Sequence, residues 1–380
     1  MSSQSGINVA IIGVGLVGSS VISQLTTIAP LASKLHIVAL QNSKKTLLSN
    51  PSSPISLAPP ADWKQILQNS QTPALSLPDL VLELQRITKE SGRHTAVVDN
   101  TSDEKVAAFY PSFLKAGLSV VTPNKKAFSG SLALYQEILQ SSKQPDATGR
   151  TPLIYQESTV GAGLPIIGTL NDLVATGDKV KKIEGVLSGT LSYIFNEFST
   201  PKGKGKNFSE IVKIAKENGY TEPHPGDDLS GSDVARKLAI LSRLVPELSS
   251  ELEEGYLSVP THSLTPAPLT DCSNGEEYVT KLPDFDQDFE DLRRLAEQEG
   301  CVLRYVGVID VEKREIKASL EKYPFSHPFA SSLSGSDNII AFHTSRYSQR
   351  PLLVQGSGAG ADVTAMGVVA DLIRVSERRG

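Results

Sequence analysis

The segment 222–237 carries the side chains with the clearest potential for chemistry in this chain. Asp233 and Lys237 are four residues apart, so on a helix they share one face. Glu222 and Asp228 precede them in the chain. Three carboxylates and one amine can therefore converge on a small polar ligand that carries an ammonium group and an oxygen to be protonated. Taken alone, the segment fits equally well with a solvated loop followed by an ordinary helical ion pair.

Prolines and glycines set the elements that must hold these side chains. Two prolines and two glycines are expected to break regular structure over 223–231, and a helix can start near Ser232. The apolar positions of 234–245 continue that helix. Another helix is predicted over 208–218, with Gly219 as its C-cap.

A glycine-rich turn near the start of the chain predicts a dinucleotide site. An apolar run over 7–12 reads as a strand, and a helical stretch extends to about Ile28. Between them the chain reads Gly13-Val14-Gly15-Leu16-Val17-Gly18. In this context Gly13 permits the tight turn, Gly15 lets the backbone approach a pyrophosphate, and Gly18 lets the helix pack close to the strand. The first amides of the helix would then face the phosphates.

The end of the second predicted strand, 36–40, bears on the choice of coenzyme. An NAD-selective site often has an acidic residue there, to bind the ribose 2′-hydroxyl. Here Gln41, Asn42 and Ser43 are followed by Lys44 and Lys45. The two lysines favour a 2′-phosphate and hence NADP, although they could also simply start a solvated helix.

Polar residues also follow two further apolar runs. One run ends in Asn100 and Thr101, and the other ends in Asn124 and Lys125. Ligands of open parallel sheets bind beyond the carboxyl ends of the strands. We therefore expect these residues near a nicotinamide or its substrate, with a plain surface lysine as the alternative for Lys125.

Composition narrows the class of protein. The chain has 380 residues, is 39% hydrophobic and 21% charged, and carries a net charge of −5. No basic run suggests nucleic acid or an anionic membrane as partner, and no apolar stretch approaches the ~20 residues of a membrane span. Two cysteines offer neither a disulfide framework nor zinc spacing. Together with an N-terminus that lacks a signal pattern, this predicts a soluble cytoplasmic protein.

The order of elements predicts an α/β chain with two domains. A Rossmann-type parallel-sheet nucleotide domain is expected over 1–155, completed by a glycine-rich turn and helix over 356–380, although a plain loop could also form that tail. An α+β catalytic and dimerisation domain with a mixed sheet is expected over 156–355. Strands predicted between 302 and 355 could pair across a dimer, or their sheet could be covered within a monomer.

Motifs along nearly the whole chain resemble homoserine dehydrogenases of the fungal, monofunctional type. The segments that carry the resemblance are 13–18, 99–101, 122–128, 157–165, 183–196, 219–223, 227–237 and 356–360. The resemblance implies an oxidoreductase that interconverts L-aspartate 4-semialdehyde and L-homoserine with NADP, and NAD as a second coenzyme. That reaction serves threonine, methionine and isoleucine biosynthesis from aspartate.

The same resemblance implies roles for individual residues. Lys237 matches the proton donor, and Lys125 is our second candidate for that role. The residues implied to bind the amino acid are Glu222, Asp228, Asp233, Gly189 and Thr190. The residues implied near the coenzyme, beside the glycine motif and Asn100, are Thr101, Lys125, Gly219 and Gly360.

A monovalent cation, most simply sodium, and a homodimer are also implied. The cation would be held by the Glu157 carboxylate with the carbonyls of Val160, Ala162 and Leu164, a donor set that suits a hard cation. A capping or ion-paired carboxylate is the alternative for Glu157. Appended regulatory or kinase domains of relatives are not expected here.

Two other functions compete with this interpretation. A nicotinamide enzyme that acts on a different aldehyde would share the glycine motif but would leave the acidic segment 222–233 unexplained. A dinucleotide-binding redox sensor would need no proton donor and would usually carry an interaction module, yet no basic recognition helix is present.

Overall fold

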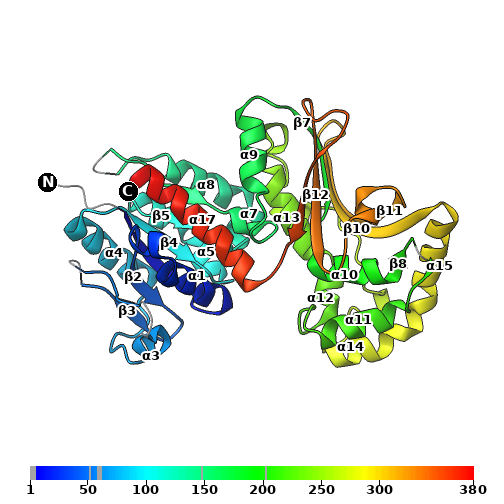
Figure 1. Cartoon of the computed structure of the whole chain (residues 1–380), viewed down its shortest axis with the longest axis horizontal. Helices are drawn as coiled ribbons and strands as arrows, with labels where there is room; N and C mark the ends of the chain where they lie inside the picture. Colours follow the sequence, from blue (N-terminus) through cyan, green and yellow to red (C-terminus); the bar gives the residue numbers. More distant parts are fainter. Residues whose placement is uncertain (1–5, 51–52, 58–61, 147–148, 202) are drawn as a thin grey trace. The chain divides into compact units, whose positions relative to one another are not determined.

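The computed structural model describes residues 6–380 except 51–52, 58–61, 147–148 and 202. The chain forms two compact units, 1–163 with 359–380 and 164–358 (Figure 1). The functional domains predicted above, with limits at 155 and 355, stay a prediction, because a compact unit is defined by packing and not by what it binds.

The first unit is built on a six-stranded sheet with the order β3-β2-β1-β4-β5-β6. Its strands are β1 (Ile7–Ile12), β2 (Leu35–Gln41), β3 (Thr46–Leu48), β4 (Thr95–Asp99), β5 (Ser119–Val121) and β6 (Ile154–Tyr155). β1 pairs in parallel with both β2 and β4, so the chain continues to opposite sides of β1. Such a switch point is where open parallel sheets bind ligands.

Helices pack around this sheet and one of them comes from the end of the chain. They are α1 (Leu16–Thr27), α2 (Ala29–Ala32), α3 (Trp63–Gln68), α4 (Leu77–Ser91), α5 (Glu104–Ala108), α6 (Tyr110–Lys115), α7 (Lys126–Ser129), α8 (Leu132–Ser142), the 3-10 turn η1 (Glu157–Thr159) and α17 (Ala361–Arg379). α17 packs along α1 (Figure 1). Its Val368 and Leu372 join the buried cluster that contains Val9 and Ile11 of β1, so the last helix completes the first core.

The second unit contains a five-stranded sheet with the order β11-β10-β7-β12-β13. Its strands are β7 (Val180–Val186), β10 (Cys301–Asp310), β11 (Glu315–Pro324), β12 (Asp337–Thr344) and β13 (Leu352–Ser357), and a small hairpin adds β8 (Ser199–Thr200) and β9 (Gly203–Lys204). β7 lies between two later hairpins and runs antiparallel to both of its neighbours.

The fold class predicted from the sequence is confirmed, with one correction on strand direction. The large sheet of the second unit is antiparallel in all its strand pairs, whereas we expected a mixed sheet there. The mixed sheet is the first one, where β3 runs antiparallel to β2. The connection from β2 to β3 is only the turn 42–45, which is too short for a parallel crossover. That turn also replaces the solvated helix considered for Lys44 and Lys45.

The second unit has a helix in a stretch that the sequence was expected to leave irregular. The α-helices are α9 (Ile167–Ala175), α10 (Gly189–Phe198), α11 (Phe208–Glu217), α12 (Pro225–Leu229), α13 (Ser232–Ser242), α14 (Gly275–Lys281), α15 (Asp286–Gln298) and α16 (Pro328–Ser331). The 3-10 turns are η2 (Pro246–Leu248), η3 (Gly255–Ser258), η4 (Ala267–Leu269) and η5 (Leu282–Phe285). α12 lies inside the stretch 223–231 that was expected to be irregular. Pro225 opens it at a position where no amide is needed, and His224 caps it.

Among the described residues, no helix combines the length and the apolar character that crossing a lipid bilayer requires.

Candidate functional site

The glycine turn of the first unit has the geometry of a phosphate cradle. Gly13 has a φ of 85°, which few residues other than glycine adopt, and its amide donates to the Gln41 carbonyl at 2.9 Å. A Cβ on Gly18 would overlap the Gly13 carbonyl oxygen, whereas a Cβ on Gly15 would meet nothing within 4 Å. The turn is therefore tight on its inner side and open at Gly15, where α1 begins with no capping side chain.

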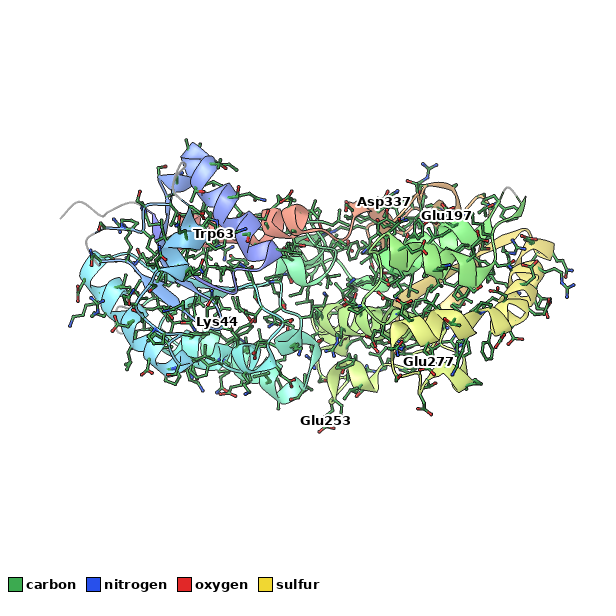
Figure 2. The ribbon with its side chains drawn as sticks, turned by 90° about the horizontal axis from the view of Figure 1, so that it is seen from below. Lys44, Trp63, Glu197, Glu253, Glu277 and Asp337 are labelled. Carbon is green, nitrogen blue, oxygen red and sulfur yellow. The ribbon has the colours of Figure 1, made fainter. Side chains whose placement is uncertain are left out.

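The turn after β2 presents only one of the two predicted lysines to solvent. The Asn42 side-chain oxygen accepts from the amides of Lys44 and Lys45, both at 2.8 Å. The Lys45 amine donates to the Ser70 carbonyl at 2.8 Å and so helps to close this turn. Lys44, which is labelled in Figure 2, is exposed.

The carboxyl ends of β4 and β5 are joined by a network around Asp99, which is fully buried. One oxygen of its carboxylate accepts from the Thr101 amide at 2.8 Å and from the Thr101 hydroxyl at 2.7 Å. The other accepts from the Tyr110 hydroxyl at 2.6 Å and from the Asn124 amide group at 3.1 Å. Burial raises the pKa of Asp99, and the donors from Tyr110 and Thr101 partly offset that effect. This network fixes both loops that carry predicted coenzyme residues.

Three other predicted coenzyme residues also belong to the first unit. Within the described part of the chain, the buried side-chain amide of Asn100 has no hydrogen-bond partner. Its backbone amide donates to the Ile12 carbonyl at 2.8 Å. Lys125 is half-buried at the start of α7. Gly360 precedes α17 with a φ of 116°. Gly219 belongs to the second unit, where it follows α11 with a φ of 70°.

The amine of Lys237 is the central group of the acidic segment. Lys237 lies on α13 and is only 6% exposed. Its amine is 2.7 Å from an oxygen of Asp233, one helical turn earlier, and donates to the Leu187 carbonyl at 2.5 Å. Asp233 is half exposed. Burial of the lysine distinguishes this pair from the surface ion pair that the sequence left open.

Asp228 organises the loop in front of α13. Its carboxylate accepts from the Thr190 hydroxyl at 2.9 Å and from the Glu222 amide at 2.8 Å, and the Thr190 hydroxyl also donates to the Tyr220 carbonyl at 2.6 Å. Burial raises the pKa of Asp228, as do the charges of Glu222 and Asp233, whereas the two hydrogen bonds lower it. The structure therefore places Glu222 and Asp233 within electrostatic reach of Asp228, with Thr190 bonded to Asp228.

Gly189 and the side chains around it lie at the start of α10. Ser188 caps this helix by accepting from the Leu191 amide at 3.2 Å. Leu187, just before that cap, accepts from Lys237 and also from the Asn338 side chain, at 3.1 Å. Sequence reasoning missed Asn338, because a single polar residue near the start of a predicted strand gives no spacing signal.

The predicted cation ligands follow β6. Glu157 is buried, and its carboxylate lies 3.3 Å from the Arg374 guanidinium of α17. Asp371 accepts from the Glu157 amide at 2.9 Å and from Arg374 at 2.6 Å. Ala162 has a φ of 56°, unusual for a residue with a side chain. Glu157, Val160 and Ala162 belong to the first unit, whereas Leu164 is the first residue of the second.

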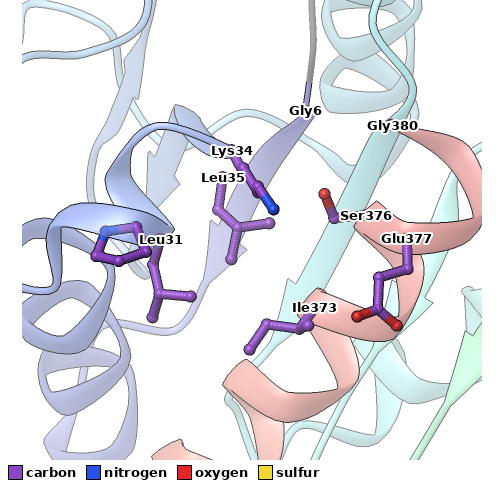
Figure 3. Close-up of a pocket in the computed structure, with 9 residues that line it drawn as sticks. Gly6, Leu31, Lys34, Leu35, Ile373, Ser376, Glu377 and Gly380 are labelled. Carbon is purple, nitrogen blue, oxygen red and sulfur yellow. The ribbon is translucent and has the colours of Figure 1, made fainter.

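A separate apolar cavity of about 280 Å³ lies in the first unit, away from the glycine turn. Leu35 of β2 and Ile373 of α17 line it together with Lys34 and Glu377, and the Lys34 amine points toward Ser376 (Figure 3). Gly6, which also lines it, precedes β1, whereas Gly13 follows that strand. The cavity is therefore at the amino end of β1, and no predicted site residue lines it.

Comparison with known proteins gives matches over the whole chain. The sequence profile described as "Homoserine dehydrogenase" matches residues 165–373, and the profile "Homoserine dehydrogenase, NAD binding domain" matches 13–151. The homoserine dehydrogenase of Saccharomyces cerevisiae is 45% identical over 372 residues, which cover 98% of each chain.

Solved structures also share the fold. A Candida auris protein of unknown function has a TM-score of 0.87 and 45% identity, over 98% of this chain and 99% of that one. A hyperthermophilic archaeal homoserine dehydrogenase in complex with NADPH has a TM-score of 0.68 over 99% of each chain. At 20% identity, this second structure supports the fold only.

Proposed function

The chain belongs to the homoserine dehydrogenase family, and we propose that it interconverts L-homoserine and L-aspartate 4-semialdehyde by NAD(P)-dependent hydride transfer. The observation that carries this proposal is the buried amine of Lys237, held beside Asp233 in a loop and helix that also present Asp228 and Glu222. The reaction is a step in the synthesis of threonine, methionine and isoleucine from aspartate.

Lys237 is the proposed proton donor. When the aldehyde is reduced, negative charge develops on its oxygen, and a cationic donor aimed at that oxygen lowers the barrier and then supplies the proton. The Leu187 carbonyl and Asp233 hold this amine in place. Lys125 remains the second candidate, from the first unit.

The acids around Lys237 are proposed to hold the amino acid. Glu222 is exposed at the loop and Asp233 is half exposed, so both carboxylates can reach a substrate ammonium. Asp228, Gly189 and Thr190 are proposed substrate contacts as well, and the bonds that Asp228 accepts from Thr190 and from the Glu222 amide also tie the loop to α10. A charge-assisted hydrogen bond to an ammonium is among the stronger contacts available to such a loop.

The first unit has the residues to bind the coenzyme, which supplies or accepts the hydride when it is bound. Gly13, Gly15 and Gly18 form the cradle for its phosphates, and a Cβ at Gly15 would occupy open space there. Asn100, Thr101, Lys125 and Gly360 of this unit and Gly219 of the second unit are the further proposed contacts. We propose NADP as the preferred coenzyme and NAD as an accepted one. The preference rests on Lys44, because the Lys45 amine is bonded to Ser70.

A monovalent cation, most simply sodium, is proposed at the turn after β6. The buried carboxylate of Glu157 with the carbonyls of Val160 and Ala162 is a donor set suited to a hard cation, and the left-handed Ala162 marks a turn held in one conformation. Arg374 already neutralises part of the Glu157 charge, so weak binding of a single positive charge is expected. The carbonyl of Leu164 stays a predicted ligand.

We also propose a homodimer in the cytoplasm. β13 is an edge strand of the second sheet, and its Leu353 is 40% exposed, a surface that a second copy could cover. Cys272 and Cys301 are free thiols, as a reducing compartment permits. Light scattering after size exclusion measures the mass, and a monomer at micromolar concentration would contradict the dimer.

Homoserine-dependent reduction of NADP, followed by the absorbance of the reduced nicotinamide, tests the reaction. Lys237→Met should lower turnover by roughly a hundredfold or more while coenzyme affinity stays near that of the wild type. Lys281→Met is the matched control, because Lys281 forms the same kind of helical pair with Glu277 but is 52% exposed. Turnover of Lys237→Met within a few-fold of wild type would remove Lys237 from the chemistry.

A further inference from the structure

We propose that Asn338 is a positioning residue for the reaction, because it holds the peptide carbonyl to which the Lys237 amine is bonded. The inference rests on the proposed role of Lys237 as proton donor. It concerns a side chain on β12 that is distant in sequence from both α13 and the acidic loop.

The carbonyl of Leu187 is shared by two donors. It accepts from the Lys237 amine at 2.5 Å and from the Asn338 side-chain amide at 3.1 Å. A peptide carbonyl offers two lone pairs, and these two bonds use both of them. Leu187 stands between β7 and the cap of α10, where the chain leaves the sheet. Asn338 therefore restrains the carbonyl at a point where the strand no longer does.

Asn338 itself is held tightly. It is 1% exposed, and its neighbour Ile339 pairs with Val186, the residue before Leu187. Gly358 lies directly against its amide group, so that a Cβ at that glycine would overlap the amide nitrogen. The residue before it, Asp337, is labelled in Figure 2. The Asn338 amide is thus enclosed between the Leu187 carbonyl and the backbone of Gly358.

Stability alone does not explain an asparagine at position 338. Among the described residues, its buried side-chain oxygen has no hydrogen-bond partner. A buried acceptor without a partner costs free energy, and an apolar side chain of similar shape would avoid that cost. Leu187 would keep one donor, Lys237, if Asn338 were replaced. What the asparagine adds is therefore the direction of the carbonyl and not the stability of the fold.

The direction of that carbonyl matters because a lysine side chain has four flexible bonds. Asp233 and Leu187 give its amine two fixed acceptors. If the Leu187 peptide can rotate, one of the two anchors moves and the amine moves with it. A displacement of about 1 Å of a reacting group can cost as much as a hundredfold in rate.

The test is Asn338→Leu, measured in the full-length enzyme. We expect kcat to fall about tenfold or more, the KM for NADP to stay within about twofold, and the thermal midpoint to stay equal or rise. Labelling of Lys237 by an amine-reactive reagent, quantified by peptide mass spectrometry, should increase because the amine is less firmly bonded. A purely structural role for Asn338 would lower the thermal midpoint instead.

Asn196→Leu is the matched control. Asn196 also donates to a backbone carbonyl, that of Gly335 at 2.9 Å, and its buried side-chain oxygen also lacks a partner in the described part of the chain. Its amide group also donates to the Ser192 hydroxyl at 3.2 Å, and neither of these two bonds reaches Lys237, Asp233 or Leu187. This variant should keep both kcat and the labelling of Lys237 at wild-type levels.

The labelling keeps this inference separate from the proposed role of Lys237. If Lys237→Met retains turnover, the proton-donor role fails, and increased labelling in Asn338→Leu still supports positioning by Asn338. If labelling and kcat of Asn338→Leu match the wild type, the positioning role is overturned whatever Lys237 does. Should the leucine variant not fold, Asn338→Ser is judged by the same criteria.

Discussion

Asp99 in the first unit and Asp228 in the second are both carboxylates whose pKa is raised mainly by burial, but their neighbours differ. Asp99 accepts from four donors of Thr101, Tyr110 and Asn124. Asp228 accepts from two donors, while the charges of Glu222 and Asp233 oppose its ionisation. The first unit thus fixes loops with a saturated network, whereas the second gathers like charges, which a cationic ligand would relieve.

This difference shows what the coenzyme site and the amino-acid site of a dehydrogenase each require. Phosphates are bound by backbone amides, so a coenzyme site can be built from glycines and rigid loops with little net charge. An amino acid with an ammonium group needs carboxylates that are not already neutralised, at some cost to the folded protein. The first unit should therefore respond mainly to changes of shape, and the second mainly to changes of charge.

The largest expected effect follows a change of shape in the first unit. Gly18→Val should weaken coenzyme binding by about a hundredfold or more, since a side chain there collides with the Gly13 carbonyl and opens the cradle. Titration of protein fluorescence with NADPH measures it. Gly92→Ala, at an open position with a φ of 67°, should lose some stability but keep its affinity. Near-normal affinity of Gly18→Val would contradict the cradle.

A second test varies the pH to compare how one buried carboxyl group from each unit affects stability. Burial raises the pKa of Glu184, but hydrogen bonds from His343 and Lys182 outweigh burial and hold it at about 2. Its folded pKa is depressed, so its contribution of about 3 kcal/mol is present above pH ~4.3 and is lost as pH falls toward 2. Burial raises the pKa of Asp371 to about 6. Because this folded pKa is raised, the folded protein is more stable by about 3 kcal/mol below pH ~4, where Asp371 is protonated. This stability is lost as the pH rises through 6.

Urea midpoints of Glu184→Gln and Asp371→Asn, compared with the wild type from pH 3 to 7, measure these two contributions. The deficit of Glu184→Gln should shrink as the pH is lowered. The wild type should lose stability relative to Asp371→Asn as the pH rises from about 4 to about 6. Curves that run parallel to the wild type at all pH values would mean that neither carboxyl titrates as described.

A smaller effect is expected from a change of charge in the second unit. Glu222→Ala should raise the KM for homoserine about tenfold, the worth of one charge-assisted hydrogen bond, and leave the KM for coenzyme unchanged. Asp227→Ala removes an exposed neighbouring charge from the first turn of α12 and serves as control. Equal increases in both Michaelis constants would assign Glu222 a structural role.

The smallest expected difference, about 1 kcal/mol, is that between two buried tyrosines. Tyr110 donates to the carboxylate of Asp99 at 2.6 Å, whereas Tyr305 donates to the neutral carbonyl of His262 at 2.8 Å. Tyr110→Phe should lower the free energy of unfolding by about 2 kcal/mol, and Tyr305→Phe by about 1 kcal/mol. Urea unfolding monitored by circular dichroism provides both values, and a larger loss for Tyr305→Phe would reverse the expected order.

The glycine turn and the Asp233–Lys237 pair could be predicted because local rules govern them. A tight turn between strand and helix requires glycines at fixed spacing, and residues four apart on a helix meet by geometry alone. The helix α13 begins at Ser232 as predicted. The burial of Lys237 was not predictable in this way, because it depends on the sheet beneath α13.

Other parts of the site depend on the tertiary fold and left no local signal. Tyr110 meets Asp99, and Asn338 meets Leu187, only after strands and helices have packed. The hydrogen bond from the Lys45 amine to the Ser70 carbonyl likewise joins segments that are separate in the sequence. The error over α12 has a local cause: proline and glycine were taken as breakers, although proline suits the first turn of a helix.

The packing of α17 in the first unit has a consequence for synthesis in the cell. The ribosome synthesises residues 6–163 long before it reaches Ala361, so the apolar surface that α17 covers in the first unit stays uncovered until about two hundred further residues have been translated. We therefore expect that surface to be available to chaperones during the interval, and we expect a frameshift near the 3′ end of the message to leave the first core incomplete.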